Sequence, residues 1–206
     1  ASLILLDRSS TTPRALLGKR GKAHAFMPDL YVFPGGRRDP GDNRVPLAQP
    51  LQDEVLNKLM ARTRARFHDK AARGLAVAAA REMMEEAHLS LTPSEYAGML
   101  RPDVSPFRFL ARAITPPGQS RRFDTRFIAA WRDDVAVALP DGGPTNELEE
   151  LCWLPIEEAK TLEIPAITRT VLEELQARLA TDPELRPGAP APFYRMLRNR
   201  FVRDTI

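Results

Sequence analysis

The sequence predicts an α+β fold in which helices pack on the faces of a mixed sheet, as in an α/β/α sandwich. Three observations support this class: β-rich segments occur in both halves of the chain, helical segments separate them, and neither a repeat nor a long linker divides the 206 residues. The composition, 43% hydrophobic and 28% charged, is ordinary for a globular protein. We therefore expect a single domain over residues 1–206.

The first half of the chain has short apolar runs, followed by two helical patterns. The turn-rich segment 9–13 separates two of the apolar runs, which favours a hairpin. Apolar residues then recur at helical spacing in two successive segments, the first of which has a basic end. The expected elements are strands at 3–6, 15–18 and 30–33, and helices at about 51–68 and 71–88.

The second half alternates strand and turn signals before its last helix. Pro165 suits the first turn of that helix, because proline lacks only an N–H that is unbonded there anyway. The expected elements are strands at 107–114, 127–131 and 150–154, and helices at about 156–161 and 165–180. Residues 183–206 form a Pro-rich tail. We expect it to dock on its own domain, with exchange to a partner or binding of a substrate phosphate as alternatives.

Charge and cysteine content narrow the function classes. The net charge of +3 suits anionic substrates, but the arginines are spread along the chain, so nucleic-acid binding is not favoured. No apolar run approaches a membrane span, and the N-terminus has no secretory layout, so we expect a cytoplasmic protein with no membrane partner. The single Cys152 allows no internal disulfide and no zinc set, and its apolar neighbours predict a buried strand thiol.

Three carboxylates gather on one edge of the second expected helix. At about 100° per residue, Glu82, Glu85 and Glu86 fit within an arc of roughly 100°. Like charges three and four residues apart destabilise a helix unless a cation lies among them. Carboxylate oxygens are the ligands that Mg²⁺ or Mn²⁺ prefers. The sequence therefore indicates metal-dependent phosphate chemistry.

The residues around this edge resemble the Nudix box. Residues 34–42 look like its opening half, in which a glycine is followed six positions on by a glutamate, and residues 81–89 look like its closing half. Asp42 and Arg81 are 39 positions apart where the family normally has eight, so about 31 extra residues lie within the box. Asp42 replaces the glutamate and His88 replaces a glycine, whereas the closing half keeps every charged position.

An interrupted box is similar to the Nudix branch that includes the peroxisomal CoA diphosphohydrolases. The segments 26–28, 31–36, 115–116 and 122–125 also resemble that branch. The resemblance implies a Nudix-type sandwich with an inserted helical segment at about 43–72. It also implies hydrolysis of a nucleoside diphosphate linked to another moiety, with CoA or acyl-CoA as candidates. The insertion could cover the site or mediate a homodimer.

The resemblance further implies roles for individual residues. Glu82, Glu85 and Glu86 would bind Mg²⁺ or Mn²⁺, with the backbone carbonyl of Gly35 or Gly36, Gly36 first, as a further oxygen. Arg81 would orient a glutamate of the box, with direct contact to a phosphate as the alternative. The box does not fix the general base: Glu147 is the first candidate, Glu82 is the rival, and a solvated acidic loop is the alternative for Glu147. Other acidic candidates in the same loop are Asp141, Glu149 and Glu150, and the candidate substrate contacts are Phe33, Arg37 and Arg122.

Other interpretations remain open from the sequence. Asp42 could pair with a cation or cap a turn, and His88 is expected to end the helix in the left-handed conformation. The aromatic residues Phe123, Phe127 and Trp131 are expected in the core or a pocket wall. The alternative functions are a catalytically silent nucleotide-binding regulator, or a hydrolase of ADP-ribose, NADH, nucleoside triphosphates or RNA 5′ ends.

Overall fold

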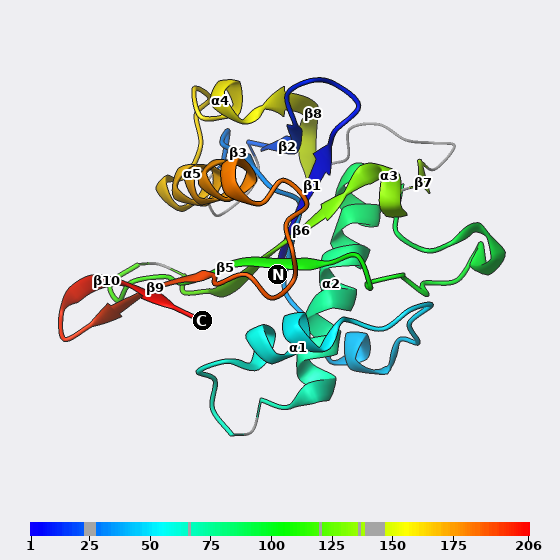
Figure 1. The fold of residues 1–206 in the computed structure, drawn as a ribbon, viewed down its shortest axis with the longest axis horizontal. Helices are drawn as coiled ribbons and strands as arrows, with labels where there is room; N and C mark the ends of the chain where they lie inside the picture. The colour runs from blue at the N-terminus through cyan, green and yellow to red at the C-terminus, as the bar shows by residue number, and fades with distance from the viewer. Residues whose placement is uncertain (23–27, 66, 120, 136, 139–146) are drawn as a thin grey trace.

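A mixed sheet of eight strands organises the chain in the computed structural model (Figure 1), which describes residues 1–22, 28–65, 67–119, 121–135, 137–138 and 147–206. The strand order is β10-β9-β5-β6-β1-β2-β3, and β8 pairs with β2 off this path. The pairs β1–β6 and β5–β9 are parallel and the others in this sheet are antiparallel. The predicted α+β class is therefore confirmed.

The elements follow the expected order. The strands are β1 (Ser2–Asp7), β2 (Arg14–Arg20), β3 (Tyr31–Val32), β4 (Leu89–Ser90), β5 (Arg108–Ile114), β6 (Asp124–Trp131), β7 (Val137–Ala138), β8 (Leu148–Pro155), β9 (Pro192–Leu197) and β10 (Arg200–Thr205). The helices are η1 (Pro40–Arg44), α1 (Asp53–Met60), α2 (Asp69–Ala87), η2 (Ser94–Tyr96), α3 (Arg132–Val135), α4 (Ile156–Ala159) and α5 (Ala166–Thr181). None of the helices in the described part of the chain is long and apolar enough to cross a bilayer.

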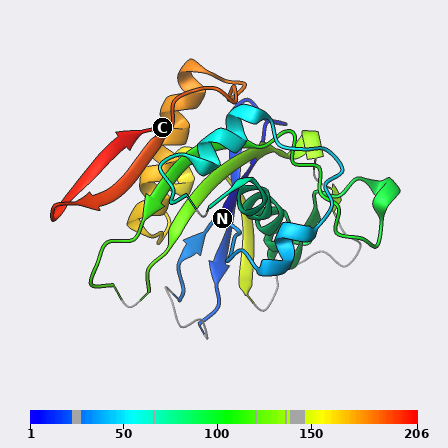
Figure 2. The ribbon, with the colours of Figure 1, turned by 90° about the horizontal axis from the view of Figure 1, so that it is seen from below.

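Two apolar cores lie on opposite faces of the sheet. Leu3 and Leu5 of β1 belong to the core that contains the buried side chains of α1 and α2. Ile4 and Leu6 belong to the core that contains those of α4 and α5. This alternation follows from the two-residue period of a strand, and it places α2 and α5 on opposite sides of the sheet (Figure 2).

The predicted insertion contributes α1 to the core. Val55, Leu56 and Leu59 are buried against α2 and the sheet, so this helix is part of the packed fold and not a movable cover. The expectation of a helix over 51–68 is wrong in its second half, because α1 ends at Met60. Arg62 has a left-handed backbone with φ of 54°, which a helix cannot continue.

An ion-pair network that contains two buried arginines fixes the end of α1 to the sheet. Arg112 of β5 donates two hydrogen bonds to Asp124 of β6, at 2.8 and 2.7 Å, and a third to the carbonyl of Ala61, at 2.7 Å. Arg126 pairs with the same aspartate at 2.9 Å. Since buried charges are stable only when paired, this network holds the inserted segment in one position.

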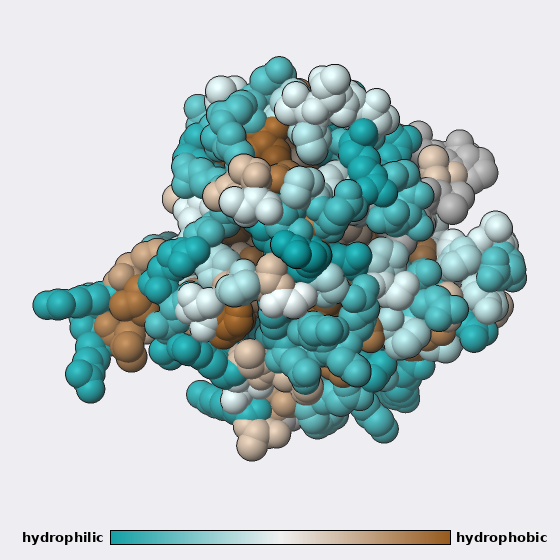
Figure 3. Space-filling model, in the orientation of Figure 1, coloured by the Kyte–Doolittle hydropathy of each residue, from teal (hydrophilic) through white to brown (hydrophobic). Residues whose placement is uncertain are grey.

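The C-terminal tail forms the hairpin β9–β10 and extends the sheet. It docks on its own domain, as expected, because β9 lies parallel to β5. The strands themselves are not predicted from the sequence. Arg198 and Asn199 form the turn, with φ of 48° and 61°, which is the geometry that two-residue hairpin loops favour. Apolar surface gathers on this hairpin, at the left of Figure 3.

His88 ends α2 in the predicted left-handed conformation, with φ of 53° and ψ of 30°. Its backbone N–H bonds to the carbonyl of Met84, which closes the helix end. The prediction of a helix terminator is therefore confirmed.

A glycine at this position is expected to stabilise the fold. Because the left-handed region is unfavourable for a residue with a Cβ, His88→Gly should raise the free energy of unfolding by about 0.5–1 kcal/mol, after allowance for the entropy of glycine in the unfolded chain. Urea unfolding of both proteins measures this difference. His88→Ala keeps the Cβ and is expected to bring no gain; equal gains in both variants would contradict the backbone explanation.

Candidate active site

A glycine turn after β3 approaches α2 and the start of β1. A Cβ at Gly35, whose φ is +154°, would overlap the backbone of Ala1 and Ser2. A Cβ at Gly36 would overlap the carboxylate of Glu82. Glycine at both positions therefore lets the turn lie directly against the acidic edge of the helix.

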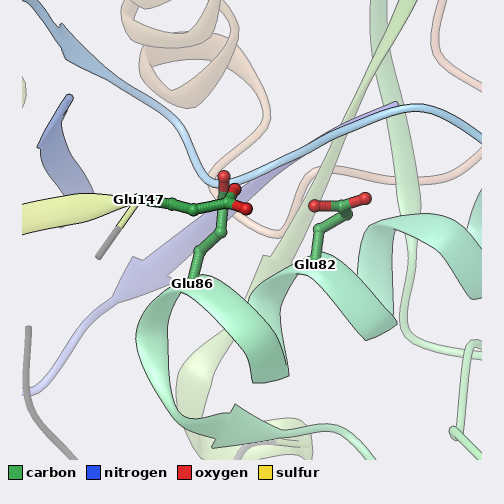
Figure 4. Close-up of side chains that lie close together, drawn as sticks. All are labelled: Glu82, Glu86 and Glu147. Carbon is green, nitrogen blue, oxygen red and sulfur yellow. The ribbon is translucent and has the colours of Figure 1, made fainter. Parts of the chain in front are cut away.

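Three carboxylates converge beside this turn (Figure 4). One oxygen from each of Glu82, Glu86 and Glu147 lies within 4.8 Å of the others. Glu82 and Glu86 are 9% and 5% exposed, whereas Glu147 is exposed and immediately precedes β8. The backbone N–H of Gly35 donates to Glu86 at 2.7 Å and fixes that side chain. Within the described residues this is the group of carboxylates whose geometry suits a metal ion.

Burial and mutual repulsion disfavour the charged forms of the two helix carboxylates. Burial raises the pKa of Glu86 to about 8, and the charges of Glu82 and Glu147 add to this against the Gly35 hydrogen bond. Burial also raises the pKa of Glu82, although the Arg81 guanidinium opposes the shift. A divalent cation among these oxygens would favour their charged forms.

Arg81 links the helix edge to the loop that follows the glycine turn. It contacts Glu85 at 2.8 Å and Glu82 at 2.9 Å, and it donates to the backbone carbonyl of Arg37 at 3.0 Å. It also donates to Asp42 at 3.2 Å, and Asp42 accepts the N–H of Asp39 at 2.7 Å. Asp42 therefore both pairs with a cation and caps the turn of η1, the two alternatives left open by the sequence.

A cavity of about 640 Å³ borders the glycine turn, and its volume is within the size range of small-molecule sites. Gly35 and Gly36 line it, together with the first residues of α5. Its apolar wall includes Phe33 and Phe127, which pack edge to face at 6.4 Å. Its described lining contains three arginines and no Asp or Glu; the arginines are Arg20, Arg37 and Arg121. This charge balance suits an anionic ligand.

The structure separates the sequence-predicted site residues into two groups. It brings Glu82, Glu86 and Glu147 together, and it directs Glu85 to Arg81, so a metal-binding role for Glu85 stays a prediction. The expected substrate contacts Phe33 and Arg37 line the cavity. Other predicted candidates lie elsewhere: Arg122 donates to the carbonyl of Thr115, Glu150 accepts from Tyr31, Glu149 is exposed, and Asp141 is outside the described residues.

Arg20 and Phe201 line the cavity but are not among the substrate contacts predicted from the sequence, and the sequence reasoning favoured Arg122 over its neighbour Arg121. Arg20 ends β2 and lowers the pKa of Glu86 through its charge, while also lining the cavity. No local motif distinguishes it from other arginines. Phe201 could have been found only by recognising the alternating pattern of the C-terminal hairpin.

The two glycines are expected to respond differently to alanine. Gly36→Ala should displace the Glu82 carboxylate and weaken Mn²⁺ binding by about tenfold to a hundredfold, with a small change in stability, because only a side-chain end must move. Gly35→Ala should instead lower the free energy of unfolding by about 2 kcal/mol, since backbone must move. Calorimetric titration with Mn²⁺ and chemical unfolding of both variants measure the two effects. Similar losses of metal affinity and of stability in both variants would contradict this prediction.

The donor set fits a divalent cation. Carboxylate oxygens from two buried side chains and one exposed side chain lie within 4.8 Å of one another, and a turn without a Cβ leaves room beside Glu82. Mg²⁺ and Mn²⁺ prefer such oxygens and keep some coordination positions for water and phosphate.

Comparison with known proteins identifies the family to which this chain belongs. A glycine turn lies against an acidic helix, and helices cover both faces of a mixed sheet. The sequence profile described as NUDIX domain matches residues 69–175, just over half of the chain. The chain belongs to the Nudix family. The match begins at the first residue of α2, so it includes the three carboxylates but not the glycine turn.

Solved structures show the same fold. A NUDIX hydrolase from Alicyclobacillus acidocaldarius is 23% identical, with a TM-score of 0.60 over 85% of this chain and 89% of that one. An Ap4A hydrolase from C. elegans in a binary complex is 16% identical, with a TM-score of 0.50 over 87% and 96%. The NUDIX domain of Shewanella oneidensis NrtR, complexed with ADP ribose, is 13% identical, with a TM-score of 0.51 over 86% and 85%. No curated protein sequence matches the chain.

Proposed function

We propose that this chain is a Mg²⁺- or Mn²⁺-dependent pyrophosphohydrolase that cleaves the diphosphate of a nucleoside diphosphate linked to another moiety. The observation that carries this proposal is the convergence of Glu82, Glu86 and Glu147 at the glycine turn, beside a cavity lined by arginines. The acidic side would hold the metal, and the basic side would hold the anionic substrate.

Each residue of the site has a defined task in this proposal. Glu82, Glu86 and Glu147 would hold the cation. The carbonyl of Gly36 accepts a hydrogen bond from the N-terminal amino group of Ala1 at 2.7 Å, so its predicted role as a metal ligand would require it to exchange this partner. When bound, the metal would offset phosphate charge and lower the pKa of an attacking water. Arg81 contacts Glu82 and Glu85, so it is a positioning residue.

The proton of the attacking water needs an acceptor. Glu147 is the first candidate, because its side chain is exposed and one of its oxygens lies within 4.8 Å of those of Glu82 and Glu86. Glu82 is the rival, but its 2.9 Å ion pair with Arg81 restrains its carboxylate. A pH–rate profile of Glu147→Gln distinguishes them: loss of the acidic limb supports Glu147, and an unchanged profile supports Glu82.

The substrate within this class is a separate part of the proposal. The resemblance of the interrupted box to the CoA-cleaving branch makes CoA and acyl-CoA the first candidates. ADP-ribose and Ap4A follow, because structures of similar fold carry these names. All of them join a diphosphate or longer phosphate chain to an adenosine, which fits an acidic metal site next to a basic cavity.

A substrate panel tests the proposal. CoA esters, ADP-ribose, Ap4A, NADH, nucleoside triphosphates and capped RNA are incubated with the protein, with Mg²⁺ or with EDTA, and the released nucleotides and phosphate are identified. We expect metal-dependent release of a nucleoside monophosphate, or of 3′,5′-ADP from a CoA ester. Binding without turnover of any compound would instead support the nucleotide-binding regulator.

A further inference from the structure

The cavity beside the glycine turn receives exposed aromatic side chains from two segments outside its buried wall. Among the described residues, four large apolar side chains are exposed: Met99, Phe123, Leu197 and Phe201. Two of the four, Phe123 and Phe201, line this cavity. Exposed aromatic rings at a cavity mouth leave apolar surface for a ligand to cover.

Phe201 is held in a fixed orientation. It lies on β10, is 58% exposed, and stacks on Tyr194 of β9 with ring centroids 5.8 Å apart and planes 13° apart. Tyr194 is 5% exposed, and its hydroxyl donates to Glu174 of α5. Arg203 binds the same glutamate through two hydrogen bonds, at 2.7 and 2.9 Å. The Phe201 ring is therefore a preorganised flat surface and not a loose side chain.

The side chains that line the cavity favour a planar nucleobase over an acyl chain as the ligand group. A saturated acyl chain is best covered by an enclosed apolar channel, whereas a planar base needs one ring face and polar surroundings. Arg20, Arg37 and Arg121 line the same cavity as Phe123 and Phe201, and they supply its cationic groups. An aromatic platform with arginines is the combination that proteins use for nucleotide bases and their phosphates.

We infer that Phe201 of the C-terminal hairpin is the platform on which the nucleobase of the substrate stacks, so that base recognition resides outside residues 69–175. This inference rests on the proposed function and deepens it. The hairpin is then a specificity element of the active site in addition to an extension of the sheet. Because stacking holds the base and not the reacting phosphorus, Phe201 affects substrate binding and leaves the chemical step unchanged.

A matched pair of variants tests the inference. Phe201→Ala removes the platform, and Leu197→Ala removes the other exposed apolar side chain of the same hairpin, which does not line the cavity. For the best nucleotide substrate we expect Phe201→Ala to raise KM about tenfold with kcat within twofold, and Leu197→Ala to change neither. Phe201→Trp should keep the KM near that of the unmodified protein. Equal kinetics of Phe201→Ala and Leu197→Ala overturn the inference.

A binding measurement separates this inference from the proposed function. Calorimetric titration with AMP, and with ribose 5-phosphate as the compound without a base, requires no turnover. We expect Phe201→Ala to weaken AMP binding about tenfold and ribose 5-phosphate binding little. An inactive protein that shows this difference contradicts the proposed function alone. The inference is overturned if AMP does not bind the original protein, or if AMP binds the original protein and Phe201→Ala equally well.

Discussion

Replacing Glu86 with glutamine is expected to lower metal-dependent turnover by about a thousandfold or more. Glu86 belongs to the carboxylate cluster, and burial and the charges of its neighbours raise its pKa to about 8. The negative charge of this carboxylate strengthens the binding of a divalent cation. The neutral amide oxygen of glutamine binds such a cation much more weakly. Loss of the cation removes the neutralisation of phosphate and the activation of water together.

The same variant should fold normally. Glutamine keeps the shape of glutamate, and its oxygen can accept the Gly35 N–H that Glu86 accepts at 2.7 Å. Removing a buried negative charge next to two others should leave the metal-free protein at least as stable as the original. Thermal unfolding in EDTA measures this stability, and kcat across a Mg²⁺ titration measures the function. A near-normal kcat at saturating Mg²⁺ would show that Glu86 is not a metal ligand.

Glu85→Gln is the matched control, because it makes the same change one residue earlier on α2. Glu85 pairs with Arg81 at 2.8 Å and is half exposed, outside the carboxylate cluster. We expect a smaller loss of turnover and a smaller shift in the Mg²⁺ midpoint than for Glu86→Gln. Equal losses would mean that the helix edge acts as one unit, with Glu85 turning toward the metal.

The part of the site that lies within one helix could be read from the sequence. The four-residue spacing places Glu82 and Glu86 on one face of α2, and the same regularity brings Arg81 to Glu85. His88 could be predicted as the helix end because its left-handed conformation is a local property. These features depend on backbone geometry within a few residues, which a sequence determines well.

The remaining parts of the site depend on contacts between distant segments. Glu147 reaches the helix only because β8 pairs with β2, which fixes where the preceding loop ends. Whether Glu85 faces the metal or Arg81 is a competition between two nearby partners that periodicity cannot decide. The cavity needs α5, the glycine turn and the hairpin to meet, so Phe201 acquires its place from the sheet order. Tertiary packing, not local pattern, decides these positions.

The raised pKa of Glu86 predicts that the metal-free protein loses stability as the pH rises. In the unfolded chain this carboxyl titrates near its ordinary value of 4.5, and in the folded chain its pKa is about 8. Between these values the folded state binds more protons, so the free energy of unfolding falls with increasing pH. The contribution of Glu86 is fully present below the lower value and is lost as the pH passes through about 8, by about 3–5 kcal/mol in total.

Comparison with Glu86→Gln isolates this contribution from those of other titrating groups. In EDTA, the free energy of unfolding of the original protein should fall relative to that of the variant between about pH 5 and pH 8, because glutamine does not titrate. Mg²⁺ should reverse the relation for the original protein alone, since the cation binds the charged carboxylates and its affinity rises with pH. A difference in the free energy of unfolding that stays constant across this pH range would show that the pKa of Glu86 is not raised. If Mg²⁺ also had no effect on either protein, Glu86 would lie outside any metal site.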